Sequence, residues 1–316
     1  MVPYGEFIMK YEKHFETETD GFHGSYYPLK GGTDKAIIEM FGDDTDDYLA
    51  KGGVKYFHKL GCSVMTMSPD KKDYGHHSYP LERIEKAVAF LREREYTKVG
   101  IVGLSTTGML TLAASSYIPD ITLTVALSPS DFIMEGFYQD NKDGMYERPG
   151  DGESTLTWRG KPLPYLPYAY RHPDYWKKIQ ADTKAYGDMV VARPMFDESE
   201  RKHPLEEEEK IKVENIRGHI IFCGAEDDVL WDTCKYIRRM MARLDEKEHF
   251  CTFEAVLSEH GTHFILPEGM MKLLAPRWMI DFFIKFAFKE AKGYIKECRE
   301  TRMDIDRCIT KAIAEW

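Results

Sequence analysis

The chain has 316 residues, of which 43% are hydrophobic and 30% charged, and its 43 Lys and Arg against 53 Asp and Glu give a net charge of −10. A chain of this length can bury a large core, in one large domain or two smaller ones. An acidic chain without a basic cluster lacks the cations that neutralise phosphates. Nucleic acids, anionic membranes and polyphosphate ligands are therefore disfavoured as partners.

The sequence also lacks the signals of membrane insertion and secretion. Its apolar stretches are too short to cross a bilayer, and residues 1–10 contain no basic region followed by an apolar one. Its six cysteines form neither a Cys-x-x-Cys pair nor a zinc-binding spacing. We therefore expect a cytoplasmic protein with free thiols, with no metal site and no cofactor.

Short apolar runs alternate with amphipathic segments along most of the chain. Turn residues predict an antiparallel hairpin over residues 15–27. Buried strands are expected at residues 35–41, 62–67, 98–104, 121–127, 219–223 and 250–257. Helices are expected at residues 48–60, 81–95, 106–117, 233–244 and 270–289. This alternation predicts the α/β class, with a mostly parallel sheet and helices on both of its faces in a single domain.

Two segments depart from this alternation. Residues 129–215 are rich in aromatic residues, Pro and Gly, and we expect them to form an inserted cap or lid. Their aromatic side chains, Tyr165 and Tyr168 among them, either line a substrate pocket or pack the cap onto the sheet. Residues 290–316 predict an amphipathic helix that lies on the body of the protein or on a second subunit of a homo-oligomer.

The most informative segment, residues 99–108, has the form of a strand, a tight turn and a helix, with Ser105 at the turn. A serine at such a strained elbow projects its hydroxyl above the sheet. The usual pattern is Gly-x-Ser-x-Gly, but here Thr107 takes the place of the second glycine and Gly108 comes one position later. The turn places the amide of Thr106, at the helix N-terminus, where an oxyanion would form.

A serine nucleophile needs a base, and the base needs an acid to orient it. Asp227 and Asp228 follow the next-to-last predicted strand, and His260 and His263 follow the last one. We prefer Asp228 as the acid because Trp231 follows it at the usual spacing. We prefer His263 as the base because two small residues precede it and an apolar stretch follows it. The order Ser, Asp, His after successive strands is more specific than any one motif.

The turn after the strand at residues 35–41 is acidic, with carboxylates at Asp43, Asp44, Asp46 and Asp47. The amide of Asp43 is the best candidate for the second oxyanion donor. The carboxylates either cap the following helix or face the pocket. A carboxylate in the pocket, such as that of Asp44, would disfavour anionic substrates and could bind a substrate amine.

Several segments together resemble a known family. They are residues 100–108, 128–132, 160–167, 216–218, 227–231 and 261–264. They resemble the catalytic domain of the acyl-CoA thioester hydrolase and bile acid-CoA:amino acid N-acyltransferase family, an α/β-hydrolase domain similar to dienelactone hydrolases. The resemblance spans residues 17–288 and implies Ser105 as nucleophile, Asp228 as acid and His263 as base.

The chain also departs from that family in ways that bear on its substrate. Eukaryotic members carry a β-sandwich domain before the hydrolase domain, and this chain has no room for one. The acyltransferases use a cysteine nucleophile, so a serine at position 105 favours transfer to water. Coenzyme A carries several negative charges, whereas this chain offers a net charge of −10 and an acidic loop.

The sequence therefore predicts a single-domain α/β-hydrolase with a cap that cleaves a carboxylic ester or thioester of a small-molecule acyl substrate through an acyl-enzyme. Three alternatives stay open. The first is an acyl-CoA thioesterase, which needs a cationic site for the nucleotide. The second is an aminopeptidase-like or amidase activity, with the acidic loop binding a free amine. The third is a non-catalytic binding protein on a hydrolase scaffold.

Overall fold

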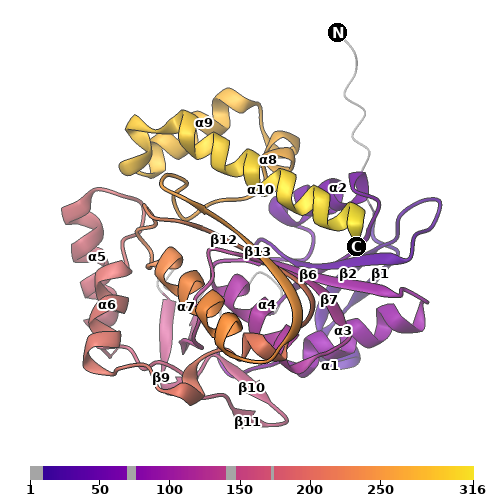
Figure 1. The fold of residues 1–316 in the computed structure, drawn as a ribbon, viewed down its shortest axis with the longest axis horizontal. Helices are drawn as coiled ribbons and strands as arrows, with labels where there is room; N and C mark the ends of the chain where they lie inside the picture. Colours follow the sequence, from indigo (N-terminus) through magenta and orange to yellow (C-terminus); the bar gives the residue numbers. More distant parts are fainter. Residues whose placement is uncertain (1–9, 70–75, 140–146, 172–173) are drawn as a thin grey trace.

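A central sheet of eight strands organises the computed structural model (Figure 1), which describes residues 10–69, 76–139, 147–171 and 174–316. In spatial order the strands are β1 (Lys13–Phe15), β2 (His23–Tyr27), β4 (Ser63–Ser68), β3 (Lys35–Met40), β6 (Lys98–Leu104), β7 (Ile121–Leu127), β12 (Arg217–Ala225) and β13 (Phe250–Ser258). From β4 to β13 all neighbours are parallel, whereas β1, β2 and β4 pair antiparallel. The expected sheet is confirmed, and the short helix α1 (Thr17–Asp20) connects the two strands of the opening hairpin.

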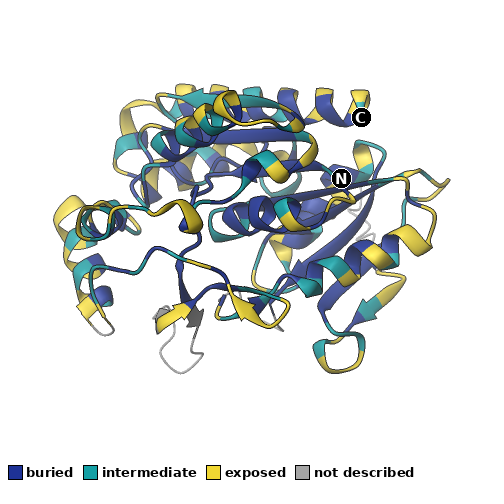
Figure 2. Ribbon diagram, turned by 60° about the horizontal axis from the view of Figure 1, so that its bottom comes forward, coloured by how far each residue is buried: buried dark blue, intermediate teal, exposed yellow. Residues whose placement is uncertain are grey.

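Helices cover both faces of this sheet, and each face has its own apolar core. One face carries α2 (Tyr48–Lys59), α8 (Glu268–Leu274) and α10 (Ile295–Glu315). The other carries α3 (Glu82–Glu93), α4 (Thr106–Tyr117) and α7 (Thr233–Glu246). Figure 2 shows the strands buried between helices whose outer sides are exposed. This arrangement is the α/β-hydrolase fold, in which parallel strands are hydrophobic throughout because both faces are covered.

The prediction of one continuous helix over residues 270–289 is wrong. The chain forms α8 and then α9 (Arg277–Ala287), separated by an extended Ala275 with φ −148° and ψ 156°. Pro276 is the cause, because proline disfavours a helical conformation in the residue before it and has no N–H to donate. The break leaves Trp278, Phe282 and Phe286 of α9 largely exposed.

The C-terminal helix α10 lies on the body, which is one of the two expected arrangements. Ile305, Ile309 and other apolar side chains of α10 belong to the same core cluster as those of α2 and α8. A buried ion pair joins Arg302 Nε to Glu268 Oε2 of α8 at 3.0 Å. Trp316, the last residue, donates from Nε1 to Thr122 Oγ1 at 3.0 Å.

The inserted segment between β7 and β12 combines strands and helices. It holds β8 (Glu135–Gln139), β9 (Glu147–Ser154), β10 (Leu156–Trp158), β11 (Lys161–Pro162), α5 (Asp174–Tyr186), α6 (Arg193–Lys202), and the 3-10 helices η1 (Glu207–Glu209) and η2 (Val213–Asn215). Strand β10 also pairs with β5 (Tyr79–Pro80), and Asp131 accepts hydrogen bonds from Arg239 of α7 at 2.7 and 2.5 Å. These contacts attach the segment firmly to the sheet domain.

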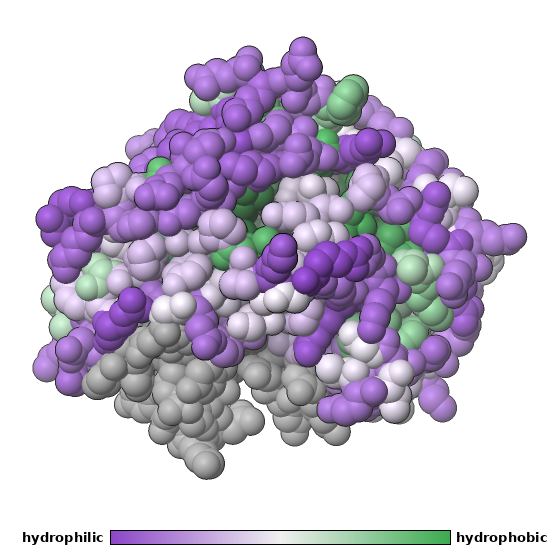
Figure 3. All heavy atoms as spheres, turned by 90° about the horizontal axis from the view of Figure 1, so that it is seen from below, coloured by the Kyte–Doolittle hydropathy of each residue, from purple (hydrophilic) through white to green (hydrophobic). Residues whose placement is uncertain are grey.

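The face opposite α9 and α10, seen in Figure 3, is largely hydrophilic, with apolar side chains visible mostly in recesses. In the described parts of the chain, no helix combines the length and the apolar character needed to cross a membrane.

Candidate active site

Ser105 lies at the junction of β6 and α4 with φ 66° and ψ −126°, a conformation that is strained for any residue except glycine. Two glycines make this turn compatible with its surroundings. A Cβ on Gly103 would lie 2.4 Å from the carbonyl oxygen of Thr107, and a Cβ on Gly108 would lie 2.6 Å from that of Leu127. The late position of Gly108 in the motif therefore matches a close approach between α4 and the end of β7.

Thr107, which takes the place of the motif's second glycine, fastens the elbow. Its hydroxyl accepts from the amide of Leu104 at 3.0 Å and lies 2.9 Å from the carbonyl oxygen of Met40 at the end of β3. The departure from the usual motif thus ties the serine turn to the neighbouring strand.

Asp228 and His263 form a buried pair at the ends of β12 and β13. His263 Nδ1 lies 2.8 Å from Asp228 Oδ2, and the two side chains are 1% and 0% exposed. The carboxylate also accepts from the amide of Leu230 at 2.9 Å and from the hydroxyl of Thr233. Because the carboxylate holds Nδ1–H, Nε2 carries the lone pair. That Nε2 is buried and has no hydrogen-bond partner among the described residues.

The other aspartate and histidine also meet, in a different way. Asp227 Oδ1 accepts from the amides of Gly261 and Thr262 at 2.9 and 2.7 Å, and its Oδ2 lies 3.4 Å from His260 Nδ1. Burial raises the pKa of Asp227, and the two amide hydrogen bonds partly offset this. Asp227 thus holds the backbone of the loop that carries His263.

Ser128, at the end of β7, links the elbow to the histidine loop. The amide of Ser105 donates to Leu127 O at 2.8 Å, and Ser128 Oγ donates to His263 O at 2.8 Å. Trp231 Nε1 donates to Ser128 O at 3.1 Å, and its ring meets the His263 imidazole edge-on at 4.7 Å. Ser128, and Thr262, which directly precedes His263, both have a positive φ, of 45° and 63°.

Sequence reasoning included Ser128 only in the family resemblance. The signal that could have found it is its position, because it follows a strand whose end lies beside the end of β6. Ser105, Asp228 and His263 therefore all lie at the carboxyl end of the parallel strands.

The acidic turn does not provide the expected second oxyanion donor. The amide of Asp43 already donates to Asp47 Oδ2 at 2.7 Å, while Asp47 Oδ1 accepts from Ala50 N at the start of α2. Asp47 therefore caps α2, which agrees with one of the two expectations for this turn. Its second carboxylate oxygen accepts the hydrogen bond of the Asp43 amide. We do not retain Asp43 as an oxyanion donor. Thr106 stays a prediction, as first-turn amides of a helix have no intrahelical acceptor.

The three residues predicted to contact substrate lie in different surroundings. Asp44 Oδ1 lies 2.9 Å from His23 Nε2, at the edge of the sheet formed by β1 and β2. Tyr168 is buried between Tyr175 and Phe196, with ring centroids 4.9 and 5.6 Å away. These neighbours belong to α5 and α6, so Tyr168 packs within the inserted segment. Tyr165 is partly buried against the same core, and burial raises its pKa.

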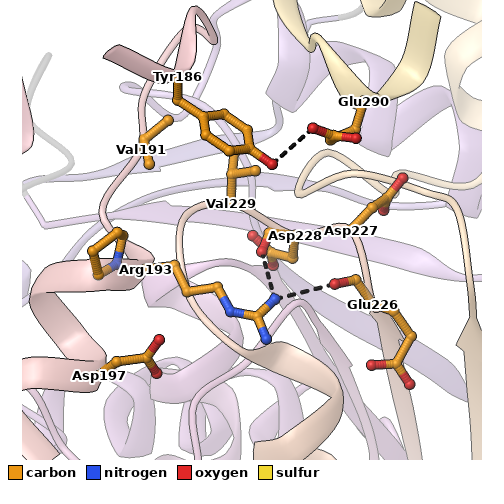
Figure 4. A pocket seen from close by; sticks show the side chains of 10 residues that line it. Tyr186, Val191, Arg193, Asp197, Glu226, Asp227, Asp228, Val229 and Glu290 are labelled. Carbon is orange, nitrogen blue, oxygen red and sulfur yellow. Dashed lines mark hydrogen bonds between the residues drawn. The ribbon is translucent and has the colours of Figure 1, made fainter. Parts of the chain in front are cut away.

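A pocket of about 420 Å³ lies beside the acid turn (Figure 4). Its lining includes the carboxylates Asp197, Glu226, Asp227, Asp228 and Glu290 and a single cationic side chain, that of Arg193. The guanidinium of Arg193 donates to the carbonyl oxygens of Glu226 and Asp228 at 3.1 and 3.2 Å and pairs with Asp232 at 2.6 Å. Neither Ser105 nor His263 lines this pocket, and its charges disfavour an anionic ligand.

Solved structures of low sequence identity resemble the chain. An esterase of Pyrococcus furiosus has 11% identity over 96% of both chains and a TM-score of 0.45. Est1E of Butyrivibrio proteoclasticus with bound ferulic acid has 12% identity over 84% of this chain and 96% of its own, with a TM-score of 0.42. A 2,6-dihydroxy-pseudo-oxynicotine hydrolase has 12% identity over 88% and 68%, with a TM-score of 0.47.

The comparison by sequence is more specific. No individual curated protein matches the chain. The family model described as BAAT / acyl-CoA thioester hydrolase C terminal matches residues 79–269, more than half of the chain. This range contains Ser105, Asp228 and His263. The chain therefore belongs to the BAAT / acyl-CoA thioester hydrolase C-terminal family.

Proposed function

We propose that this protein is a serine hydrolase that cleaves a carboxylic ester or thioester through an acyl-enzyme. The observation that carries the proposal is the buried pair in which His263 Nδ1 lies 2.8 Å from Asp228 Oδ2. His263 Nε2 has no hydrogen-bond partner among the described residues, and His263 follows its strand at the same carboxyl end of the parallel sheet as the strained Ser105 turn. Membership of a thioester hydrolase family supports the same class of chemistry. A buried nitrogen without a hydrogen-bond partner lowers the stability of the fold. The Ser105 hydroxyl would be that partner when substrate is bound.

The residues would act in the following order. Ser105 Oγ attacks the carbonyl carbon while His263 Nε2 takes its proton, and Asp228 stabilises the imidazolium. The carbon bond to the leaving oxygen or sulfur then breaks, and His263 returns the proton to the leaving group. A water molecule, activated by the same imidazole, attacks the acyl-enzyme and releases the acid. The amide of Thr106 would stabilise the oxyanion in both steps.

The family match favours an acyl-CoA thioester as a second candidate substrate. The charges near the acid turn argue against it, since the one cation that lines the adjacent pocket, Arg193, is engaged by Asp232 and two carbonyl groups. We therefore place uncharged esters and thioesters first. Hydrolysis of p-nitrophenyl esters and of acyl-CoAs with the same acyl chain compares the two. Faster hydrolysis of the acyl-CoAs would reverse this order.

A fluorophosphonate probe, which reacts with activated serines, tests the mechanism directly. We expect the parent protein to be labelled and Ser105→Ala to lose the label. Ser116→Ala is the matched control, because Ser116 lies on the same helix α4 and its hydroxyl donates to the helix's own backbone, at Ala113 O and 2.7 Å. This control should be labelled like the parent. An unreactive parent, or full labelling of Ser105→Ala, would show that the proposed nucleophile is wrong.

A further inference from the structure

Three side chains with metal-ligating atoms converge at the edge of the sheet, outside the candidate active site. His14 lies on β1, Glu16 follows that strand, and His23 begins β2. Glu16 Oε1 lies 3.1 Å from His14 Nε2, and Glu16 Oε2 lies 3.6 Å from His23 Nδ1. One ligand atom from each of the three residues falls within 4.8 Å of the other two.

His23 is the buried member of this cluster, with 1% of its surface exposed. Its Nε2 lies 2.9 Å from Asp44 Oδ1, and a carboxylate there holds the proton on Nε2. Nδ1 is left with a lone pair that faces Glu16, and this buried atom has no hydrogen-bond partner among the described residues. Buried polar atoms are almost always satisfied, and a bound cation would satisfy this one.

His14 is oriented in the same manner. Its Nδ1 lies 2.8 Å from Ser25 Oγ, which in turn lies 2.9 Å from Thr45 Oγ1. A proton on Nδ1 donated to Ser25 leaves the lone pair on Nε2, which lies 3.1 Å from Glu16 Oε1. Each imidazole therefore has an oxygen partner behind it, the arrangement that usually orients histidines that bind metals.

We propose that His14 Nε2, a carboxylate oxygen of Glu16 and His23 Nδ1 bind a divalent transition-metal ion, Zn²⁺ in particular. Two imidazoles and one carboxylate are a common donor set for zinc. A tetrahedral zinc with bonds of about 2.0 to 2.1 Å separates its ligand atoms by roughly 3.3 Å. Each imidazole lies close to that distance from one Glu16 oxygen, at 3.1 Å from Oε1 and 3.6 Å from Oε2, and one ligand atom from each residue lies within 4.8 Å of the others, so small side-chain shifts would complete the site. The Glu16 side chain is half exposed, so the ion can arrive from solvent and keep a water as its fourth ligand.

Such an ion would connect two parts of the fold. It would fix the edge strand β1 to β2. Asp44, the partner behind His23, and Thr45, which contacts the Ser25 hydroxyl behind His14, belong to the acidic turn that precedes α2. Metal binding should therefore stabilise the folded protein, because the three ligands meet only when the hairpin has formed.

Titration calorimetry with ZnCl₂ on the chelator-treated full chain, without a polyhistidine tag, tests the site. We expect saturable binding of one equivalent, with at least tenfold weaker affinity in His14→Gln and Glu16→Gln. His219→Gln is the matched control. His219 forms an ion pair with Glu254 at the same 3.1 Å, and its side chain is 27% exposed, as is that of His14, but among the described residues no third such ligand lies within 4.8 Å of both. Among the described residues, no other set of three such ligands converges.

Two further measurements separate loss of ligands from loss of fold. Asp44→Asn keeps the shape of the side chain behind His23 and should weaken zinc binding about 10- to 100-fold. Zinc should raise the midpoint of thermal unfolding in the parent and in His219→Gln, but not in Glu16→Gln, whose exposed side chain can change without unfolding the chain. Absence of saturable binding by the parent, or undiminished binding by both His14→Gln and Glu16→Gln, would overturn the proposal.

Discussion

Two aspartate–histidine pairs, one residue apart in the sequence at Asp227 and Asp228, differ in what their carboxylates bind. Asp228 directs an oxygen to His263 at 2.8 Å, and that pair is almost fully buried. Asp227 uses one oxygen for two backbone amides, and its His260 lies 3.4 Å away and partly exposed. The residue types are the same, so hydrogen bonding and burial separate a pair suited to proton transfer from a pair that holds a loop.

The largest effect should come from the two histidines. We expect His263→Gln to lower kcat for an active ester by about 10⁴-fold or more, because serine loses its base. His260→Gln should stay within about tenfold of the parent, since it lies against Asp227 and stacks on Tyr294. Steady-state kinetics on both variants check this, and equal losses would erase the distinction between the pairs.

The aspartates should show the same asymmetry at a smaller scale. Asp228→Asn should reduce kcat by about 10⁴-fold with little change in KM, because an amide no longer holds the imidazole in the right tautomer. Asp227→Asn keeps an oxygen for the amides of Gly261 and Thr262, so its kcat should fall by roughly tenfold at most. A larger loss in Asp227→Asn than in Asp228→Asn would transfer the acid role to Asp227.

Glu39 on β3, a fully buried carboxylate, extends the comparison to one that lacks donors. Neither of its oxygens has a hydrogen-bond partner among the described residues. Burial first, and the nearby charge of Asp47, raise its pKa well above the ordinary value of 4.5. The folded state therefore binds this proton more tightly than the unfolded state, and its stabilising contribution is complete only below pH 4.5.

Between pH 4.5 and the raised pKa, the free energy of unfolding should fall with rising pH by up to about 1.4 kcal/mol per pH unit. Glu39→Gln should remove this slope, because its side chain does not ionise. Urea unfolding of both proteins from pH 5 to 8 measures the difference. Parallel stability curves for the parent and the variant would contradict the assignment.

The smallest effect concerns the stack of His260 on Tyr294, whose ring centroids are 3.5 Å apart with an interplanar angle of 10°. Tyr294→Leu should lower the free energy of unfolding by about 0.5 to 1.5 kcal/mol. Its kcat should change little, because the stack supports the structural pair. A kcat loss comparable to that of His263→Gln would mean that the second pair also serves the reaction.

Much of the fold could be predicted because its signals are local. Buried strands, amphipathic helices and the glycines around Ser105 are short patterns, and the structure has the strands and most of the helices at the expected positions. The break at Pro276 was also visible in the sequence, but the apolar periodicity on both sides obscured it. The inserted segment was expected as a cap, whereas the packing role of Tyr168 depended on neighbours from α5 and α6.

Local sequence patterns are enough to predict the α/β order, the serine turn and the positions of two aspartates and two histidines, since turns after strands follow from nearby residues. The contact of Asp228 with His263 and the hydrogen bond from the Asp43 amide to Asp47 come from the three-dimensional fold. It alone brought Asp44 behind His23, 21 positions away in the chain. Side-chain hydrogen bonds of this kind depend on burial and on contacts between helices, strands and loops that are far apart in the sequence. A local sequence pattern predicts neither.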